Sequence, residues 1–227
     1  MITAVAFVPS TPMLIPVVAE GAAHELDDVR SASIDVVRVA TDGVDDVVIV
    51  GRGQHTRLMM AGIGSLRGFG VDVEIPLGDG SSDEIGLAGT IGLWLLSQAQ
   101  WQGSTSVQEV TDGDDCRQVG LELAAAPGTR ALIIVGDGSA ARTEKAPGYL
   151  HPDAEAFDAE VERALRTGDG SALASLDAGR SAEVMASGWP AWQLAAACVE
   201  QSQVTSSSLS VYAPFGVGYF VALWNCS

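Results

Sequence analysis

The segment LIIVGDGSAARTE, residues 132–144, joins a strand pattern to side chains that can do chemistry. Four apolar residues and a glycine are followed by Asp137 and Ser139. Ligands of open α/β sheets bind at the carboxyl ends of strands, so a carboxylate and a hydroxyl there indicate a site. The next residues, Ala140 and Ala141, can neither ligate a metal nor transfer a proton. The segment therefore predicts a site and leaves open whether that site is catalytic.

Two other loops follow apolar runs and also carry polar groups. They are PSTPMLIP, residues 9–16, and GRGQHTR, residues 51–57. The polar side chains of interest in the three loops are Ser10, Thr11, Arg52, His55, Arg57, Asp137, Ser139 and Arg142. If the preceding strands are parallel neighbours, their carboxyl ends share one edge of the sheet. We therefore expect the loops at 9–12, 51–57 and 136–142 to meet around one pocket.

Several familiar catalytic patterns do not fit these residues. A Ser139–His55–Asp137 triad lacks the Gly-x-Ser-x-Gly turn, and its serine and aspartate are better placed to bond local backbone amides. The chain has no P-loop, and GRGQHT lacks the third glycine of a dinucleotide fingerprint. His24 is expected on a solvated helix face and His151 at a helix start. One remaining histidine does not make an iron or zinc centre, so no metal site is predicted.

The elements that must position these loops alternate between strands and helices. Apolar runs predict buried strands at 2–8, 46–50 and 131–135, edge or half-buried strands at 71–75 and 106–110, and a terminal antiparallel pair at 209–213 and 217–224. Apolar spacing of three to four residues predicts helices at 20–40, 83–99, 114–126, 153–166 and 181–200. The pattern predicts one α/β domain over 1–227, a three-layer α/β/α fold with a mixed, mostly parallel central sheet.

Charge and cysteine content narrow the functional classes. The chain has 12 basic and 29 acidic residues and a formal net charge of −17. Such a surface repels phosphate backbones and anionic lipids, so neither nucleic acid nor a membrane is an expected partner. Three widely spaced cysteines fit a reducing compartment, and no apolar stretch has the pattern of a signal peptide or a membrane span. We therefore expect a cytoplasmic protein.

Taken in order, the loops resemble those of the class III extradiol ring-cleavage dioxygenases and the related Memo proteins. FVPSTPMLIP is similar to the family's first strand and Pro-His-Pro-Pro loop, and VVIVGRGQHT to its second strand, which ends in Ser-Pro-His-Gly. LIIVGDGSAAR is similar to its Gly-Asp-Leu-Ser-His segment. PGYLHPDAEAFDAEVERAL, ASGWPAWQLAAA and APFGVGYFVAL continue the likeness over nearly the whole chain.

The resemblance also implies where the family's chemistry would lie. In that family two histidines and a carboxylate (a cysteine in Memo) hold a metal, which is iron(II) in the dioxygenases, and a further histidine acts as the base. By position, the ligands would fall at Ser10, at Gly53 and near Ser187, and the base at Ala140. None of these residues matches its counterpart's chemistry. The resemblance thus implies a divergent member that binds no iron or other cofactor.

These considerations predict a noncatalytic protein of the dioxygenase-like fold that binds a small ligand or a protein. The candidate pocket residues are Ser10, Thr11, Arg52, His55, Asp137, Ser139, Arg142 and Ser187. Positive charge from Arg52 and Arg142 favours a small anionic or phenolic ligand.

Two alternatives remain at this point. One is a ring-opening oxidoreductase with a rearranged metal site of His55, Asp137 and Glu183, because Glu183 would lie one helical turn before Ser187. The other is a structural protein, a homodimer or a complex subunit, with an interface built from tryptophans. Those tryptophans would be Trp94, Trp189 and Trp192, although burial in the core is the stronger expectation for each.

Overall fold

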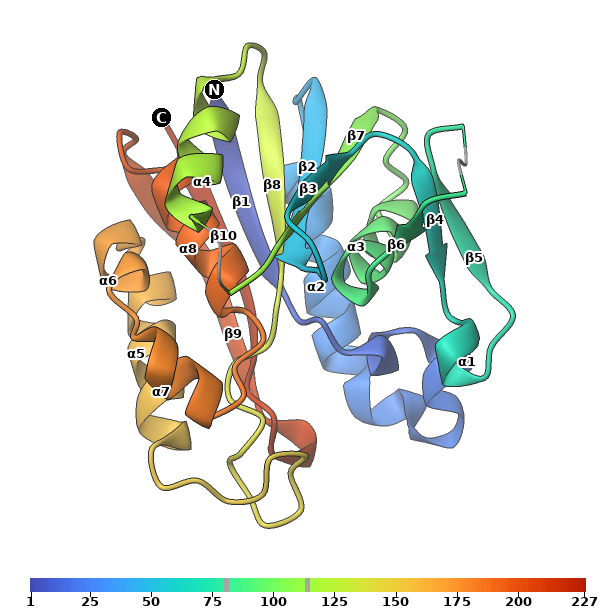
Figure 1. Ribbon diagram of the computed structural model, residues 1–227, viewed down its shortest axis with the longest axis vertical. Helices are drawn as coiled ribbons and strands as arrows, with labels where there is room; N and C mark the ends of the chain where they lie inside the picture. Colours follow the sequence, from blue (N-terminus) through green and yellow to red (C-terminus); the bar gives the residue numbers. More distant parts are fainter. Residues whose placement is uncertain (80–81, 113–114) are drawn as a thin grey trace.

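A seven-stranded mixed sheet forms the centre of the protein in a computed structural model, which describes residues 1–79, 82–112 and 115–227 (Figure 1). The strand order is β3-β7-β2-β8-β1-β10-β9. The bounds are β1 Ile2–Val8, β2 Asp46–Arg52, β3 Arg57–Met59, β7 Ser104–Val110, β8 Arg130–Val135, β9 Val204–Tyr212 and β10 Tyr219–Cys226. β8 pairs in parallel with β1 and β2, and β2 with β7, whereas β3, β10 and β9 pair antiparallel. The predicted parallel centre and antiparallel terminal pair are confirmed.

Helices cover both faces of this sheet. Helices α2 and α3 contact the sheet on one face, and α5 and α8 contact it on the other, with α4 packed on α8. Their bounds are α2 Asp27–Ala40, α3 Leu87–Gln98, α4 Cys116–Ala125, α5 Ala154–Thr167 and α8 Trp189–Cys198. Shorter helices are α1 Pro16–Ala19, α6 Gly170–Ala174 and α7 Ala178–Glu183, with 3₁₀ turns at Pro12–Leu14, Glu20–Leu26, Arg67–Phe69 and Pro214–Gly216. The α/β class predicted from the sequence is confirmed.

Strand β8 shows why a continuous apolar run belongs in the middle of such a fold. Successive side chains of a strand point to opposite faces. Leu132 and Ile134 join the core beneath α5 and α8, whereas Ala131 and Ile133 join the core beneath α2 and α3. Each residue of β8 is buried. The strand therefore holds the loop that follows it at a fixed point between two packed layers.

Two strand predictions differ from the structure. The strand expected at 71–75 begins only at Glu74, and it belongs to a separate three-stranded sheet of β4 Gly62–Ser65, β5 Glu74–Leu77 and β6 Glu84–Ile85. The segment at 106–110 is a strand, but it is fully buried because β3 pairs on its outer side. The alternation of apolar and polar residues in this segment did not indicate that the three-residue strand β3 would pair along its outer edge.

Three predicted helices also differ from the structure. The helix expected at 83–99 begins only at Leu87, because Glu84–Ile85 form β6. Residues 20–26 form 3₁₀ turns before α2, and the helix expected at 181–200 breaks between α7 and α8. Met185 in this break has a left-handed backbone with φ of 57°, and Pro190 lies in the first turn of α8, where proline is favoured. Within the described ranges, no helix is long and apolar enough to cross a membrane.

Candidate functional site

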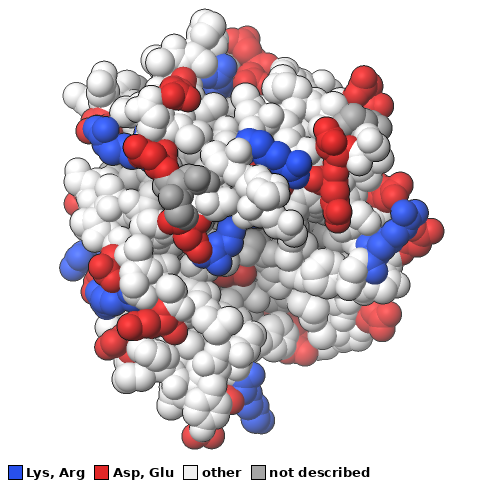
Figure 2. Space-filling model, in the orientation of Figure 1, with Lys and Arg blue, Asp and Glu red and all other residues white. Residues whose placement is uncertain are grey.

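Three polar residues from distant parts of the chain meet at the carboxyl ends of β1 and β8. The Ser10 backbone N–H and hydroxyl donate to the two Asp137 carboxylate oxygens, each over 2.7 Å. The Ser187 Oγ accepts from the Asp137 backbone N–H over 3.0 Å and lies 3.2 Å from the Ser10 Oγ. We call these residues the Ser10–Asp137–Ser187 cluster. Figure 2 shows that this face of the molecule is hollowed near its centre, at the level where the central strands end in Figure 1.

The topology explains why these residues meet. Val8 and Val135 are register partners in the parallel β1–β8 pair, so the chain leaves both strands at the same height. The third member arrives from the break between α7 and α8, where the Gly188 N–H donates to the Asp137 carbonyl over 2.9 Å. A side chain at Gly136 would place its Cβ only 2.3 Å from the Gly188 Cα. Two glycines therefore allow the backbone approach that the cluster needs.

Burial controls the ionisation of the cluster. It raises the pKa of Asp137 to about 6, although the two hydrogen bonds from Ser10 oppose the shift. Nearby, burial and the negative charge of Asp137 raise the pKa of Tyr219 to about 12, and its hydroxyl hydrogen-bonds the Thr11 side chain. Tyr219 was missing from the predicted site. Its sequence signal was weak, a single phenol in the apolar strand VGYFVALW.

Ser139 and Arg142 contribute to a second polar group, centred on Asp158. The Ser139 N–H donates to Asp158 Oδ1 over 2.7 Å, and an Arg142 guanidinium nitrogen lies 3.6 Å from Oδ2. The Ser139 hydroxyl accepts from the Ala141 N–H, which is the local bond the sequence predicted. The corresponding prediction for Asp137 was wrong, because its carboxylate binds Ser10 across the two loops.

The third loop makes different contacts. The Arg52 guanidinium pairs with Asp112, and Arg57 donates to Glu109 over 2.8 Å, so both arginines are held toward β7. His55 is exposed in the loop between β2 and β3. The structure therefore unites Ser10, Asp137 and Ser187, with Thr11 beside them, whereas the positive charge expected there is paired elsewhere.

The donor set of the cluster does not fit iron(II). It consists of two neutral hydroxyls and one carboxylate whose two oxygens already accept hydrogen bonds from Ser10. At the implied second ligand position, a Cβ on Gly53 would lie 2.6 Å from the Glu109 side chain. Iron(II) sites are built from imidazole and free carboxylate ligands, neither of which this arrangement offers.

The rearranged site of His55, Asp137 and Glu183 is not formed. Among the residues with described positions, no three His, Cys, Asp or Glu side chains gather as metal ligands. The helical spacing assumed for Glu183 and Ser187 was wrong, because α7 ends at Glu183, whose side chain is exposed. His151 behaves as expected, since its Nδ1 accepts from the Asp153 N–H at the start of α5.

The packing of the three tryptophans fits the core burial expected for them and not the interface of the structural alternative. Trp192 is 1% exposed and packs edge-on against Phe220, and the Trp189 indole N–H donates to the Leu176 carbonyl. Trp94 is half-buried and packs against the core beneath α2 and α3. These side chains stabilise the fold.

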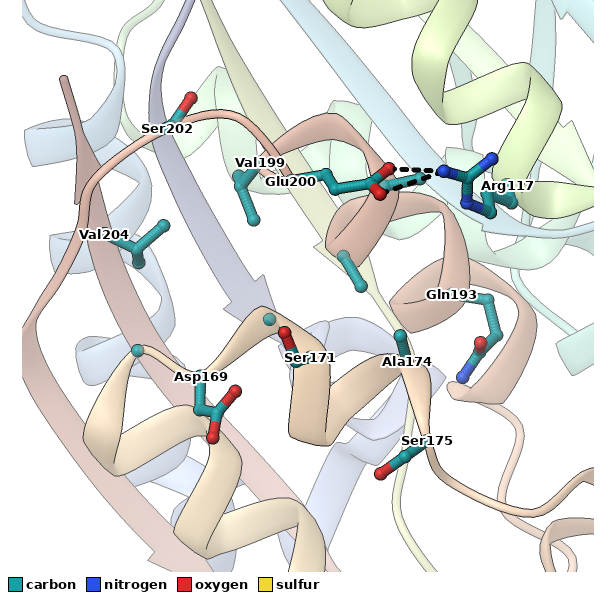
Figure 3. Close-up of a pocket in the computed structure, with 14 residues that line it drawn as sticks. Arg117, Asp169, Ser171, Ala174, Ser175, Gln193, Val199, Glu200, Ser202 and Val204 are labelled. Atoms are coloured by element: carbon teal, nitrogen blue, oxygen red, sulfur yellow. Dashed lines mark hydrogen bonds and ion pairs between the residues drawn. The ribbon is translucent and has the colours of Figure 1, made fainter.

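A separate pocket of about 590 Å³ lies between α4, α6, α8 and the start of β9 (Figure 3). None of the predicted site residues lines it. One Arg117 guanidinium nitrogen donates to both Glu200 carboxylate oxygens across one wall, and the Gln193 side chain donates to the Leu173 carbonyl. Its strongest polar groups thus have partners within the protein.

The Asp137 pKa predicts how stability depends on pH. The folded value of about 6 exceeds the unfolded value of about 3.9, so the folded state binds more protons between them. The Asp137 contribution therefore favours folding at low pH and is lost as the pH rises through about 6. We expect urea unfolding across this range to show that the free energy of unfolding of wild type falls relative to that of Asp137→Asn as the pH rises. A constant difference would contradict the shifted pKa. Burial also raises the pKa of Asp158 to about 6, so Asp158 makes its own contribution to the pH dependence of stability, which is the same in Asp137→Asn and wild type.

The comparisons with known proteins show the fold without a function. No family model matches the chain, and no curated protein matches it. Among solved structures, it is similar to the crystal structure of the uncharacterized protein JW3007 from Escherichia coli K12, with a TM-score of 0.57 and 15% identity. The match covers 98% of this chain and 99% of that one. The two proteins therefore share the α/β fold over nearly their full lengths.

Proposed function

We propose that this chain is a noncatalytic, small-ligand-binding protein of the extradiol dioxygenase type, with its ligand at the Ser10–Asp137–Ser187 cluster. One observation carries the proposal. The Ser10 and Ser187 hydroxyls lie 3.2 Å apart although they are 177 residues apart in the chain. The resemblance assigns the first metal ligand to the position of Ser10 and the third to a position near Ser187. Their proximity supports an inherited site in which hydrogen-bonding hydroxyls have replaced metal-binding side chains.

The charges around the cluster favour a phenolic ligand over an anionic one. The two arginines expected to attract an anion pair instead with Asp112 and Asp158. The ionised Asp137 carboxylate repels a second carboxylate. Each of its oxygens accepts one hydrogen bond from Ser10 and has a second lone pair for the hydroxyl of a phenol, and hydrogen bonds to charged groups are the stronger ones. Binding of a neutral phenol also adds no further charge that would be buried without a partner.

Thermal stabilisation by matched ligands tests the proposal. We expect substituted phenols to raise the unfolding temperature more than the corresponding benzoates at neutral pH. A ligand at 100 times its Kd adds about 2.7 kcal/mol to the free energy of unfolding. Asp137→Asn should weaken phenol binding about tenfold, the equivalent of about 1.4 kcal/mol for a lost charged hydrogen bond. Arg52→Ala is the matched control and should bind as wild type does.

Two results would contradict the proposal. The first is that phenols and benzoates raise the unfolding temperature equally, and do so in Asp137→Asn as in wild type. The ligands would then bind away from the cluster. Uptake of one iron per chain that His55→Ala abolishes would favour the oxidoreductase alternative. Anaerobic iron(II) loading followed by elemental analysis measures this directly, and we expect no stoichiometric iron.

A further inference from the structure

Strand β9 forms one edge of the central sheet and has a backbone edge open to another strand. Within the described part of the chain it pairs with β10 alone. Its register against β10 shifts between Leu223 and Trp224, which leaves Ser207 as an extra residue in β9. This bulge divides β9 into a first part and the segment Ser208–Tyr212.

The first part of the edge is shielded by the turn between α5 and α6. Gly168 has a left-handed φ of 67°, and a Cβ there would lie 3.2 Å from the Val204 carbonyl oxygen and 3.4 Å from the Ser206 nitrogen. The chain therefore approaches β9 closely at this level. The segment Ser208–Tyr212, which we call the open edge segment, lies beyond the bulge.

Beyond the bulge and the Gly168 turn, which protect its first part, β9 has no protecting side chains. Monomeric proteins discourage edge pairing with charged residues, especially lysine, or with proline. Residues 203–212, QVTSSSLSVY, contain neither, although the chain carries 12 basic and 29 acidic residues. A net charge of −17 opposes self-association over most of the surface. Pairing along this strand would therefore place no like-charged side chains of β9 opposite each other.

The side chains of the open edge segment suit pairing with an identical strand. Leu209 and Val211 are half-buried against the core on one face, and Ser208 and Ser210 are exposed on the other. Antiparallel pairing of two such segments would continue the sheet from one copy to the next. Leu209 of each copy would lie opposite Val211 of the other, and the two Ser210 hydroxyls could hydrogen-bond each other.

We propose that a second copy of this chain pairs with the open edge segment, antiparallel and about a twofold axis near Ser210. The contact is self-complementary, so it closes as a dimer and leaves no free edge on that side. The dimer is independent of the proposed ligand site, because no residue of the Ser10–Asp137–Ser187 cluster belongs to β9. Either proposal can fail without the other.

A cysteine cross-link tests the pairing. Residues directly opposite in antiparallel strands have Cα atoms about 4.5–5.5 Å apart, within the range that a disulfide spans. Ser210→Cys should therefore form a disulfide-linked dimer under mild oxidation. Thr205→Cys, exposed on the shielded part of the same strand, is the matched control and should remain monomeric on a nonreducing gel. The native Cys116, Cys198 and Cys226 are buried and do not compete.

Light scattering over a concentration series provides the second measurement. Wild type and Ser210→Ala should be dimers, whereas Ser210→Asp should weaken association by about tenfold or more, because like charges facing each other destabilise a strand pair. Circular dichroism checks that Ser210→Asp remains folded. A wild-type chain that stays monomeric throughout would overturn the proposal. So would a dimer unaffected by Ser210→Asp, or equal cross-linking at positions 205 and 210.

Discussion

Replacing Asp158 with alanine is expected to lower the free energy of unfolding by about 2–4 kcal/mol. Asp158 is 3% exposed and connects α5 to the loop that follows β8. Its Oδ1 accepts from the buried Ser139 N–H, and its Oδ2 faces the Arg142 guanidinium at 3.6 Å. Alanine would leave a buried donor without an acceptor and a half-buried arginine without its closest carboxylate.

Urea unfolding at neutral pH measures this loss, and two variants control it. Asp158→Asn keeps an oxygen for the Ser139 N–H and removes only the charge, so it should cost less than alanine. Glu155→Ala removes a carboxylate 3.9 Å from Arg142 whose side chain is 76% exposed. Exposed pairs of this kind contribute about 0–1 kcal/mol. If Asp158→Ala were as mild as Glu155→Ala, the buried interaction would be of little importance to stability.

The sequence predicted the centre of the fold because burial on both faces leaves a clear local pattern. Strands 2–8, 46–50 and 131–135 are runs of almost entirely apolar residues, and the structure places them side by side and parallel. Element breaks were harder to predict. The helix expected at 181–200 has apolar spacing throughout, yet Met185 adopts a left-handed backbone and the chain turns there to reach β8. Gly188 and Pro190 are local signals of that break, whereas the direction in which the chain turns depends on the tertiary contact with β8.

The site was predicted in part for the same reason. Ser10 and Asp137 follow strands whose order the apolar pattern indicated, and they do meet. Arg52 also follows a central strand, but its partner Asp112 comes from the far side of β2. Tyr219 reaches the cluster through an antiparallel neighbour of β1. The order of the strands indicates which loops are neighbours. The direction of a long charged side chain depends on which oppositely charged residue the fold brings within reach.

The close approach of Gly136 and Gly188 leads to the second large expected effect. A Cβ on Gly136 would lie 2.3 Å from the Gly188 Cα and 3.2 Å from its nitrogen, and both contacts are with backbone. Backbone atoms at the junction of β8 and α8 cannot rotate away as a flexible side chain could. We expect Gly136→Ala to reduce the free energy of unfolding by about 3 kcal/mol, the upper part of the range for overpacking a core.

Separation of β8 from α8 should also disturb the cluster, because Ser187 and Asp137 are joined across this junction over 3.0 Å. Gly68→Ala is the matched control: nothing lies within 4 Å of a Cβ there, and the added methyl should leave stability unchanged or raise it slightly. Urea unfolding of both variants gives the comparison, and phenol binding by Gly136→Ala reports on the cluster. If Gly136→Ala were as stable as wild type, the Gly188 Cα would have to lie farther than 2.3 Å from the position of the added Cβ. The close approach would then not be what holds Ser187 against Asp137.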